Sequence, residues 1–471
     1  MEPAKTEIVV IGGGPGGYAA AFYAADLGKK VTLIEMDRLG GVCLNRGCIP
    51  SKALLHATKM IAEARESALR GISFGEASVD LDKLRTWKDG ILTKLTGGIA
   101  QLAKARGVEV ITGKAYLDDS HTVRVETAEG QRYLRFDHAI IATGSVPALP
   151  KAFDLGNPRI MTSTEALEIP DVPSRLLVIG GGYIGMELGT VYAMLGSEVN
   201  VVEATDTLLA GSDPDLARPV IVAAQKKFKS VRFKAKVTSM STAGKQIKVV
   251  VEQDGKGSEE LYDRVLVAVG RRPSELDLGL DNTKVQRDDK GFVKVNESLQ
   301  TDDPAIFAIG DLVGGAMLAH KATKEARLAV TAIVGDSAPH RQFVVPAVVF
   351  TEPELAWCGL TEAEAKAKGL EVEVARFSWG ASGRALTFDR PDGLTKLVIE
   401  PGTERILGVG LVGHGAGELI GEGVVAVELG ATVTDLAECV HPHPTLSETL
   451  MEAAESYFGH ATHAFQRRRP Q

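Results

Sequence analysis

One stretch of sequence occurs twice in this chain, and it limits the possible folds more than any other feature. Residues 8–35 and 176–203 align without a gap. Each reads as an apolar strand, a Gly-x-Gly-x-x-Gly turn, a helix of small residues and a second apolar strand ending in Glu. In such a turn the first glycine permits the tight bend, the second lets backbone amides approach a pyrophosphate, and the third lets helix and strand pack closely. A single glycine triplet can be an empty turn, but repetition of the whole pattern predicts two dinucleotide-binding α/β units.

The glycines of the two turns are Gly12, Gly14 and Gly17 in the first copy and Gly180, Gly182 and Gly185 in the second. Glu35 and Glu203 close the two copies, at the position where an acid can hydrogen-bond a ribose hydroxyl. No basic residue follows Glu203 until Arg218, and Glu203 itself would repel a 2′-phosphate. The second unit is therefore expected to prefer NAD(H) to NADP(H).

Three further apolar segments end in glycine, as the returning strands of nucleotide-binding units do. They read HAIIATGS (138–145), RVLVAVGRRP (264–273) and AIFAIGDLVG (305–314). The last segment places Asp311 at the carboxyl end of a strand, where ligands bind in open α/β sheets. Because Asp is also a common turn residue, its position alone leaves both interpretations open.

The composition excludes several classes of protein. With 44% hydrophobic and 24% charged residues, the 471-residue chain is typical of a globular protein of several domains. The formal charge of −8 is modest, and the short run RRR at 467–469 is typical of a solvated tail, so nucleic acid is not an expected partner. The sequence shows no signal-peptide pattern and no run of about 18 apolar residues. We therefore expect a cytoplasmic protein without a membrane partner.

Two of the four cysteines, Cys43 and Cys48, lie within the stretch GGVCLNRGCIPSK. Gly47 and Pro50 suit the start of a helix, so Cys48 would lie near a helix N-terminus, where the dipole stabilises a thiolate. Lys52 follows at i+4 on the same face and adds a cation. A zinc site would need more ligands, inert buried thiols would not need Lys52, and a structural disulfide would stabilise so small a loop very little. The pair is therefore predicted to be a redox-active disulfide, and no metal site is expected.

These motifs together resemble those of the flavin-dependent pyridine nucleotide–disulfide oxidoreductases. The resemblance covers essentially the whole chain, through GGVCLNRGCIPSKALL, GGGYIGMELG, IFAIGDLVGGAMLAHKA, VVFTEPELAWCGLTEAEAK and HPHPTLSE. Within the family it is greatest for the members that oxidise protein-bound dihydrolipoyl groups with NAD+. The resemblance implies that the first unit binds FAD and the second binds NAD.

The resemblance also implies an α/β fold in which the NAD unit is inserted into the FAD unit and a C-terminal α+β dimerisation domain follows. The expected divisions are 1–149 for the first part of the FAD-binding domain, 150–273 for the NAD-binding domain, 274–345 for the segment completing the FAD domain and 346–471 for the dimerisation domain. Apolar patterning places the strands LTKLVIE and ILGVGLVG and the helix GELIGEGVVAVELG in the last domain.

Four residues near the flavin receive roles from the resemblance. Cys43 would exchange with the substrate thiol, and Cys48 would face the flavin. Lys52 and Glu187 would pair beside the reactive end of the flavin. The counterpart of Glu187 in the first copy of the repeat is Ala19, and an acid in the first turn of a helix is also favourable by itself.

The stretch HPHPTLSE near the end of the chain has two interpretations. By its residues alone it is a proline-stiffened entry to a helix, with Thr445 and Glu448 forming a capping box. The resemblance makes His443 the base that deprotonates a substrate dithiol, with Glu448 orienting its ring. This base would come from a second subunit, so an obligatory homodimer is expected. Cys439, His441 and His443 alternate, but a metal site would need a fourth ligand.

The resemblance assigns further residues to the two cofactors. For FAD these are Gly12, Gly14, Pro15, Gly17, Glu35, Gly41, Lys52, Gly113, Thr143, Gly144, Ser145, Asp311, Met317, Leu318, Ala319 and His320. For NAD they are Gly180, Gly182, Tyr183, Ile184, Gly185, Glu187, Glu203, Val237 and Gly270.

The implied partners are a second copy of the chain, dihydrolipoamide, and the lipoyl-bearing acyltransferase and peripheral-subunit-binding domain of a 2-oxoacid dehydrogenase complex. A glycine cleavage system would present the same lipoyl chemistry, and the sequence does not distinguish the two. The family commonly has an apolar residue where this chain has Arg46. A cation there is expected to favour thiolate forms and to raise the reduction potential of the disulfide.

Other interpretations of the same motifs remain. Glutathione reduction with NADPH is disfavoured by Glu203 and by the lack of nearby basic residues. Mercuric ion reduction would want extra cysteines in the terminal stretch GHATHAFQRRRPQ, which has none. A flavin-binding scaffold or redox sensor without turnover would not need Cys43, Cys48 and His443 together.

Overall fold

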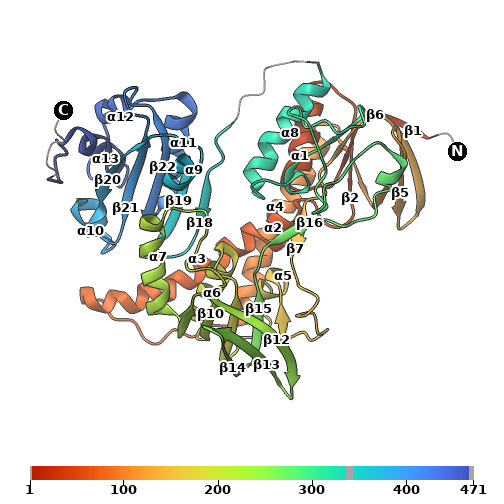
Figure 1. Cartoon of the computed structure of the whole chain (residues 1–471). Coiled ribbons are helices and arrows are strands. Elements are labelled where there is room, and N and C mark those ends of the chain that lie inside the picture. The colour runs from red at the N-terminus through yellow and green to blue at the C-terminus, as the bar shows by residue number, and fades with distance from the viewer. Residues whose placement is uncertain (1–2, 336–342, 466–471) are drawn as a thin grey trace.

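The computed structural model describes residues 3–335 and 343–465. Two units are built on sheets with parallel centres, and a third unit, toward the C-terminus, is built on an antiparallel sheet (Figure 1). The predicted basic run at 467–469 lies outside the described residues.

The first unit is built on a seven-stranded sheet. Its strands lie in the spatial order β3 (Glu109–Thr112), β2 (Val31–Glu35), β1 (Ala4–Ile11), β6 (Gly130–Ile141), β5 (Thr122–Thr127) and β4 (Lys114–Asp119), and β17 (Ile306–Ala308) also pairs with β6. The centre is parallel, with Val10 opposite both Leu33 and Ile140. These three side chains are buried, as the strands of a parallel sheet covered on both faces require.

The second unit is built on a five-stranded parallel sheet. Its strands lie in the order β11 (Ser230–Arg232), β10 (Glu198–Val202), β9 (Arg175–Ile179), β15 (Arg264–Val267) and β8 (Ile160–Met161). An antiparallel sheet of β12 (Ala235–Ala243), β13 (Gln246–Gln253) and β14 (Lys256–Tyr262) belongs to it, and β7 (Ser145–Pro147) pairs with β16 (Arg271–Pro273). Because β17 returns to the first sheet after these strands, the second unit is inserted into the first, which confirms the expected architecture.

The C-terminal unit is built on a five-stranded antiparallel sheet. Its strands lie in the order β18 (Ala347–Val349), β19 (Glu354–Gly359), β22 (Ile406–Gly413), β21 (Leu394–Ile399) and β20 (Glu373–Ser378). Helix α11 (Ala416–Leu429) packs on β19 and β22, and helix α13 (Glu448–Phe458) packs on β20 and β21. The two strands and the helix expected from apolar patterning are therefore present.

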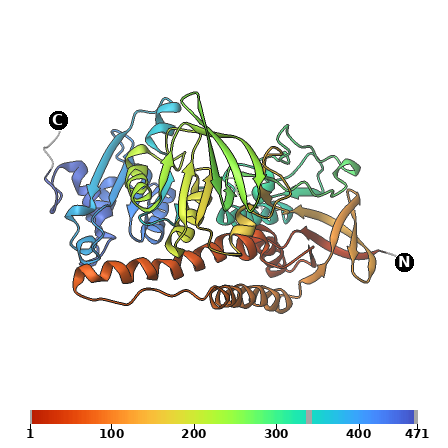
Figure 2. The ribbon, with the colours of Figure 1, turned by 90° about the horizontal axis from the view of Figure 1, so that it is seen from below.

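The remaining helices connect and cover the sheets. They are α1 (Pro15–Asp26), α2 (Gly41–Arg46), α3 (Cys48–Glu66), η1 (Ser67–Arg70), α4 (Leu81–Ala105), α5 (Ser163–Ala166), α6 (Tyr183–Leu195), α7 (Pro214–Lys227), η2 (Leu280–Asn282), η3 (Gly310–Val313), α8 (Ala319–Ile333), α9 (Glu362–Ala367), η4 (Trp379–Ala381), α10 (Gly383–Thr387) and α12 (Val433–Glu438). Helix α1 packs against α8, and α3 packs against α6 of the second unit. Figure 2 shows α3 running from the first unit, along the second, toward the C-terminal unit.

The structure tests only some of the remaining expectations about the whole chain. The fold class is confirmed, whereas the domain divisions after residues 149, 273 and 345 stay predictions. Among the described residues, no helix combines the length and the apolar character needed to cross a bilayer.

Candidate active site

The two glycine turns have nearly the same geometry, because the same residue pattern imposes the same backbone. Gly12 and Gly180 have φ angles of +105° and +109°, in the region that favours glycine. The third glycine of each turn packs beneath the first: a Cβ on Gly17 would lie 1.7 Å from the carbonyl oxygen of Gly12, and a Cβ on Gly185 would lie 2.2 Å from that of Gly180. Each turn can therefore present its amides to a phosphate group.

The acids that end the two copies brace these turns. Glu35 Oε2 accepts a hydrogen bond of 2.6 Å from the amide of Gly13, and Glu203 Oε2 accepts one of the same length from Gly181. Glu203 Oε1 also accepts from the amide of Thr205 at 2.7 Å. The carboxylates are therefore fixed at the mouth of each turn, where a ribose would lie.

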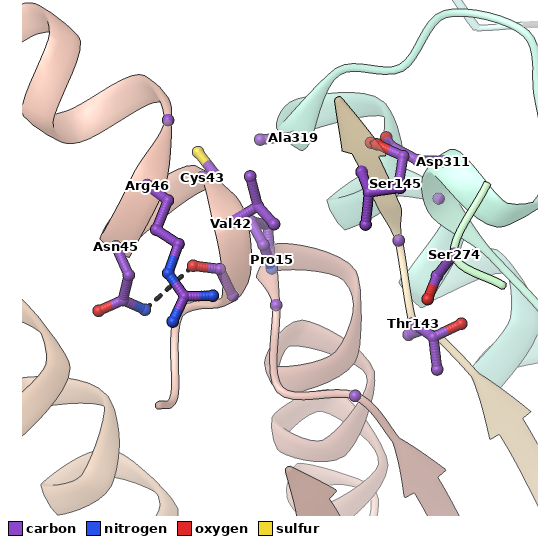
Figure 3. A pocket seen from close by; sticks show the side chains of 18 of the residues that line it. Pro15, Val42, Cys43, Asn45, Arg46, Thr143, Ser145, Ser274, Asp311 and Ala319 are labelled. Atoms are coloured by element: carbon purple, nitrogen blue, oxygen red, sulfur yellow. Dashed lines mark hydrogen bonds between the residues drawn. The ribbon is translucent and has the colours of Figure 1, made fainter. Parts of the chain in front are cut away.

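The first pocket lies at the carboxyl ends of β1, β2 and β6 and reaches into α3. Predicted FAD residues that line it are Gly12, Gly14, Pro15, Glu35, Gly41, Lys52, Gly113, Thr143, Gly144, Ser145, Asp311, Met317 and Ala319. Three others do not line it: Gly17 packs under the turn, Leu318 lines the second pocket, and His320 Nε2 donates to the carbonyl of Pro346 at 2.7 Å. Figure 3 shows Thr143, Ser145 and Asp311 on one side of this pocket and Cys43 and Arg46 on the other.

Several features of the first pocket fit a bound FAD. The hydroxyl oxygen of Thr143 is buried and has no hydrogen-bond partner among the described residues, so a ligand group can satisfy it. Helix α1 begins at Pro15, and its N-cap residue Gly14 has no side chain to cap the first amides, which leaves them for a pyrophosphate. Opposite, Ser145 donates to Asp311 and accepts a 2.8 Å bond from Nε of Arg271, which holds Asp311 at the pocket wall.

The cysteine pair lies in the same pocket. Helix α2 carries Cys43, and α3 begins at Cys48, as expected. Both are free thiols in the structure, and Cys43 donates a hydrogen bond to the sulfur of Cys48. That bond, followed by the positive charge of Lys52, outweighs burial and lowers the pKa of Cys48 to about 7, whereas the same bond and burial raise the pKa of Cys43. Cys48 is therefore the sulfur of the pair that more readily forms a thiolate.

Lys52 and Glu187 are brought together, as the resemblance implied. Nζ of Lys52 lies 3.1 Å and 2.9 Å from the two carboxylate oxygens of Glu187, which is almost completely buried. Glu187 also accepts a bond of 3.0 Å from the amide of Phe350, and Nζ of Lys52 lies 4.4 Å from the centre of the Phe350 ring. The lysine is thus fixed one helical turn from Cys48.

The second pocket lies at the carboxyl ends of β9, β10 and β15. Predicted NAD residues that line it are Gly180, Gly182, Tyr183, Ile184, Glu203, Val237 and Gly270. Gly185 packs beneath the turn instead, and Glu187 lines only the first pocket. The two pockets meet, because Tyr183, Ile184, Arg271 and Met317 line both. A ligand in one pocket can therefore reach a ligand in the other.

The structure does not bring His443 to the cysteines within one chain. His443 lies after α12 with an exposed side chain, does not line the first pocket, and donates from Nδ1 to Glu448 at 2.8 Å. The predicted capping box is only half formed: Glu448 accepts from the amide of Thr445, but α13 begins at Glu448, and the Thr445 hydroxyl donates to Pro442. Because Glu448 is acceptor-only when ionised, the bond from His443 leaves Nε2 as the basic nitrogen.

The neighbouring polar residues do not gather into one site. Nε2 of His441 lies 2.6 Å from a carboxylate oxygen of Glu422, and Cys439 is exposed. The segment that carries them is irregular. Cys358 is buried in β19, as expected of a small apolar side chain.

Arg46 lines the first pocket, and its expected effect on the sulfurs stays a prediction. Its guanidinium pairs with the carboxylate of Asp37 at 2.5 Å, and Figure 3 shows its side chain extending away from the sulfur of Cys43. Among nearby charges, Lys52 lowers the pKa of Cys48 and Glu187 raises it.

Sequence reasoning missed several residues of the first pocket. Arg271, Asn45 and Ser274 line it. The two arginines after RVLVAVG were a usable signal for Arg271, because they follow a predicted strand end directly. Asn45, whose amide donates to the carbonyls of Leu39 and Gly41, had only its position between the cysteines to mark it.

Comparison with known proteins agrees with this geometry. The pyridine nucleotide-disulphide oxidoreductase family matches residues 6–326, and the dimerisation domain of the same family matches residues 345–454. The chain belongs to the pyridine nucleotide–disulphide oxidoreductases. This confirms the predicted enzyme class, and because the family uses FAD and NAD, it confirms the two predicted cofactors. The dimerisation domain likewise agrees with the expected homodimer.

Curated members of the family cover nearly the whole chain. Proteins named dihydrolipoyl dehydrogenase are 44% identical in Vibrio cholerae over 97% of each chain, 45% identical in Haemophilus influenzae over 97% of this chain and 96% of that one, and 42% identical in Staphylococcus aureus over 98% of each.

Among solved structures, LpdA from Mycobacterium tuberculosis superposes with a TM-score of 0.88 at 28% identity, covering 96% of this chain and 99% of the other. The HOCl-induced flavoprotein disulfide reductase RclA from Escherichia coli, in a Cu(II) complex, gives 0.85 at 26% identity, with the same coverage.

Proposed function

We propose that this protein oxidises protein-bound dihydrolipoyl groups with NAD+ as the electron acceptor. The observation that carries the proposal is the position of Cys48. Its pKa is lowered, which favours the thiolate, and it lies in a pocket that is continuous with the second dinucleotide pocket. Near-full-length relatives named dihydrolipoyl dehydrogenase, at 42–45% identity, support this substrate.

The thiol chemistry follows from the properties of the two sulfurs. In the oxidised enzyme, the thiolate of a dihydrolipoyl group attacks Cys43, and the Cys43–Cys48 bond breaks, so that Cys48 leaves as a thiolate. Lys52 stabilises that thiolate. The second substrate thiol then loses its proton and displaces Cys43. The products are a lipoyl disulfide, the Cys43 thiol and the Cys48 thiolate, so two electrons pass to the protein.

FAD, when bound in the first pocket, supplies the two-electron chemistry that connects the dithiol to a nicotinamide. The chain's own part is to align the three centres. Thr143, Ser145 and Asp311 are on the wall of the first pocket, and Glu203 at the second turn would accept from the ribose of NAD+.

The base of the reaction comes from a partner subunit in this proposal. Within one chain His443 is exposed on the C-terminal unit, which is the dimerisation domain of the family. The partner subunit's His443 would remove the substrate proton at Nε2, and its Glu448 would hold the ring and stabilise the imidazolium. The two active sites of a dimer would then each use residues of both chains.

The lipoyl group would be presented by a carrier. We propose the lipoyl-bearing acyltransferase of a 2-oxoacid dehydrogenase complex, with its peripheral-subunit-binding domain as the docking partner, and the lipoyl carrier of a glycine cleavage system as the alternative. Because a thiol pair that cycles through a dithiol suits a reducing compartment, we place this activity in the cytoplasm.

Two measurements test the proposal. Holoenzyme with free dihydrolipoamide should form NADH at 340 nm with NAD+, and much more slowly with NADP+; absence of NADH formation refutes the activity. Inactive Cys48→Ser and His443→Ala variants should regain activity when their subunits are exchanged, because one mixed site has both groups intact. If subunit exchange is demonstrated and no activity returns, the shared site is wrong.

A further inference from the structure

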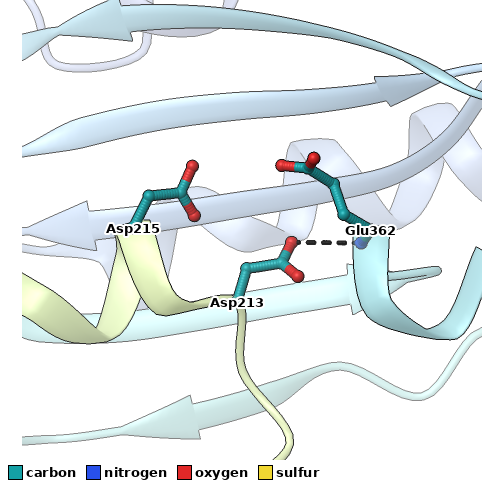
Figure 4. A group of neighbouring side chains, drawn as sticks. All are labelled: Asp213, Asp215 and Glu362. Atoms are coloured by element: carbon teal, nitrogen blue, oxygen red, sulfur yellow. Dashed lines mark hydrogen bonds between the residues drawn. The ribbon is translucent and has the colours of Figure 1, made fainter. Parts of the chain in front are cut away.

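A buried lysine in the C-terminal unit gathers three carboxylates around its charged end. Lys396 on β21 has only 1% of its side chain exposed. Its Nζ lies 2.7 Å from a carboxylate oxygen of Asp213 and 3.0 Å from one of Asp215, and it also pairs with Glu362. Figure 4 shows the three carboxylates close together: Asp215 on α7, Asp213 on the loop just before α7, and Glu362 on α9. Two of the three therefore belong to the second unit, and the lysine to another.

The three carboxylates have the arrangement of a cation site, but a protein cation already fills it. Their oxygens lie within 4.8 Å of one another, and Lys396 bonds to all three residues. Arg376 on β20 adds bonds of 2.7 Å to Asp215 and 2.5 Å to Glu362. Although burial acts the other way on each group, these bonds lower the pKa of Asp215 and raise that of Lys396, so both stay ionised. The network is an ionic joint between units rather than a metal site.

The joint fixes the first residues of α7. Asp213 is the N-cap residue of this helix, yet its side chain makes no capping bond within α7. It is turned instead to Lys396 and to the amide of Glu362, which donates to it at 3.2 Å. Leu216, in the first turn of α7, packs against β22. A Cβ added to Gly410 on that strand would lie 2.2 Å from Cδ1 of Leu216. The start of α7 is therefore held by the C-terminal unit.

The segment just before α7 forms part of the second pocket. Residues 204–212 lead from Glu203 to Asp213, and Ala204 and Ala210 line the pocket. The amide of Leu209 donates to the carbonyl of Gly181 in the glycine turn at 3.0 Å.

Leu208 packs the same segment against the second glycine turn. It is completely buried, and its Cδ2 lies 2.5 Å from the position that a Cβ on Gly181 would take. The segment therefore lies directly on the turn that presents its amides to the dinucleotide.

We propose that Lys396 is a positioning residue for NAD+, acting from another unit through Asp213, Asp215 and the 204–212 segment. Lys396 does not line the second pocket. It anchors the downstream end of the segment, and the contacts of Leu208 and Leu209 hold that segment against the glycine turn. Without Lys396, the downstream end of the 204–212 segment is no longer held in place. The wall that this segment forms in the second pocket, where the adenosine would bind, is then no longer fixed. This inference rests on the second pocket being the NAD site of the proposed function.

The test compares Lys396→Met with a matched control. Lys248→Met removes a lysine of the second unit whose ion pair with Glu259 is exposed on the antiparallel sheet. In Lys396→Met holoenzyme we expect the Kd for NADH and the KM for NAD+ to rise about tenfold, equivalent to about 1.4 kcal/mol. Amide hydrogen exchange of residues 204–212 should also rise. Reduction of the enzyme by dihydrolipoamide without NAD+, and its FAD content, should stay unchanged, and Lys248→Met should change none of these quantities.

A second variant keeps the test open if Lys396→Met does not fold. Arg376→Met leaves the buried lysine in place and removes only its partly exposed neighbour, so we expect a smaller rise, about threefold, in the same Kd. Equal effects of Lys396→Met on NADH binding and on thiol-side reduction, or an effect on NADH no larger than that of Lys248→Met, would overturn the proposal. NADH binding is measured without dihydrolipoamide, so failure of the proposed substrate and failure of this inference give different results.

Discussion

Nζ of Lys52 on α3 lies 2.9 Å from Oε2 of Glu187 on α6, so an ion pair joins the two nucleotide-binding units beside the cysteine pair. A buried carboxylate is costly unless it is paired, and Glu187, with 3% of its surface exposed, has both Lys52 and the amide of Phe350. The pair therefore balances the charge of Glu187 while it keeps a cation close to Cys48.

Removing that cation should raise the pKa of the reduced enzyme's Cys48. The value of about 7 comes first from the hydrogen bond of Cys43 and then from the charge of Lys52, whereas Glu187 acts in the opposite direction. The thiolate forms as the pH rises through about 7. In Lys52→Met we expect the midpoint of iodoacetamide alkylation to move up by about one unit, and in Glu187→Gln to move down. Shifts in the same direction for both variants would contradict this account.

Loss of the base should affect only the thiol side of the reaction. For His443→Gln we expect kcat with dihydrolipoamide to fall about 10² to 10⁴-fold, because a general base contributes this much. Glu448→Gln should cause a smaller loss, since the ring keeps a hydrogen-bond partner. NADH oxidation with ferricyanide serves as the control, because it needs no substrate thiol. Equal losses in both assays would mean that the variant damages the fold or the FAD site.

Glu203 should set the preference between NAD+ and NADP+. Its carboxylate braces the turn at Gly181 and would accept from the ribose hydroxyls. Because a hydrogen bond to a charged group contributes about 1.5 to 3 kcal/mol, Glu203→Ala should lower kcat/KM for NAD+ at least about tenfold. The value for NADP+ should change little or rise. Glu198→Ala, at the start of the same strand β10, is the control and should leave the ratio of the two values unchanged.

Arg46 should influence the redox potential less than its position between the cysteines suggests. Since Asp37 pairs with it, Arg46→Val is expected to shift the potential of the Cys43–Cys48 couple by less than about 30 mV, which for two electrons equals a tenfold change in equilibrium constant. Asp37→Asn should shift it upward, because it unmasks the cation. Equilibration with a reference dithiol buffer measures both potentials. A large downward shift in Arg46→Val would contradict this prediction and would mean that the charge of Arg46 raises the potential of the disulfide.

The ion pair between Lys59 on α3 and Glu352 of the C-terminal unit should make the stability of the protein sensitive to acid. Although burial raises the pKa of Glu352, His414 and Lys59 outweigh this and hold the value at about 2. A depressed folded-state pKa gives stability that is complete above the unfolded value of about 4.3 and is lost as the pH falls toward 2. We expect Glu352→Gln to cost on the order of 2 kcal/mol in urea unfolding at pH 6. The difference from the unsubstituted protein should shrink at pH 3.5; a constant difference would assign the loss to packing.

The parts of this protein that could be predicted from its sequence are those with a local signature. The glycine turns follow from the spacing of their glycines, and Gly12 and Gly180 have the positive φ that such a turn requires. The pairing of Lys52 with Glu187 joins distant positions and came only from resemblance. The Lys396 joint has no signature at all, since its members lie on separate helices and strands and meet only after the second and C-terminal units have packed together.

Helix α3 carries a consequence for how such a chain can change. Its first residue is Cys48, Lys52 binds the second unit, Lys59 binds Glu352 at 2.6 Å, and Glu66 at its end binds Arg390. This single helix therefore has contacts in all three units. The three units cannot be exchanged between relatives as independent modules, because a transplanted C-terminal unit must match the far half of a helix whose near end holds the reactive sulfur.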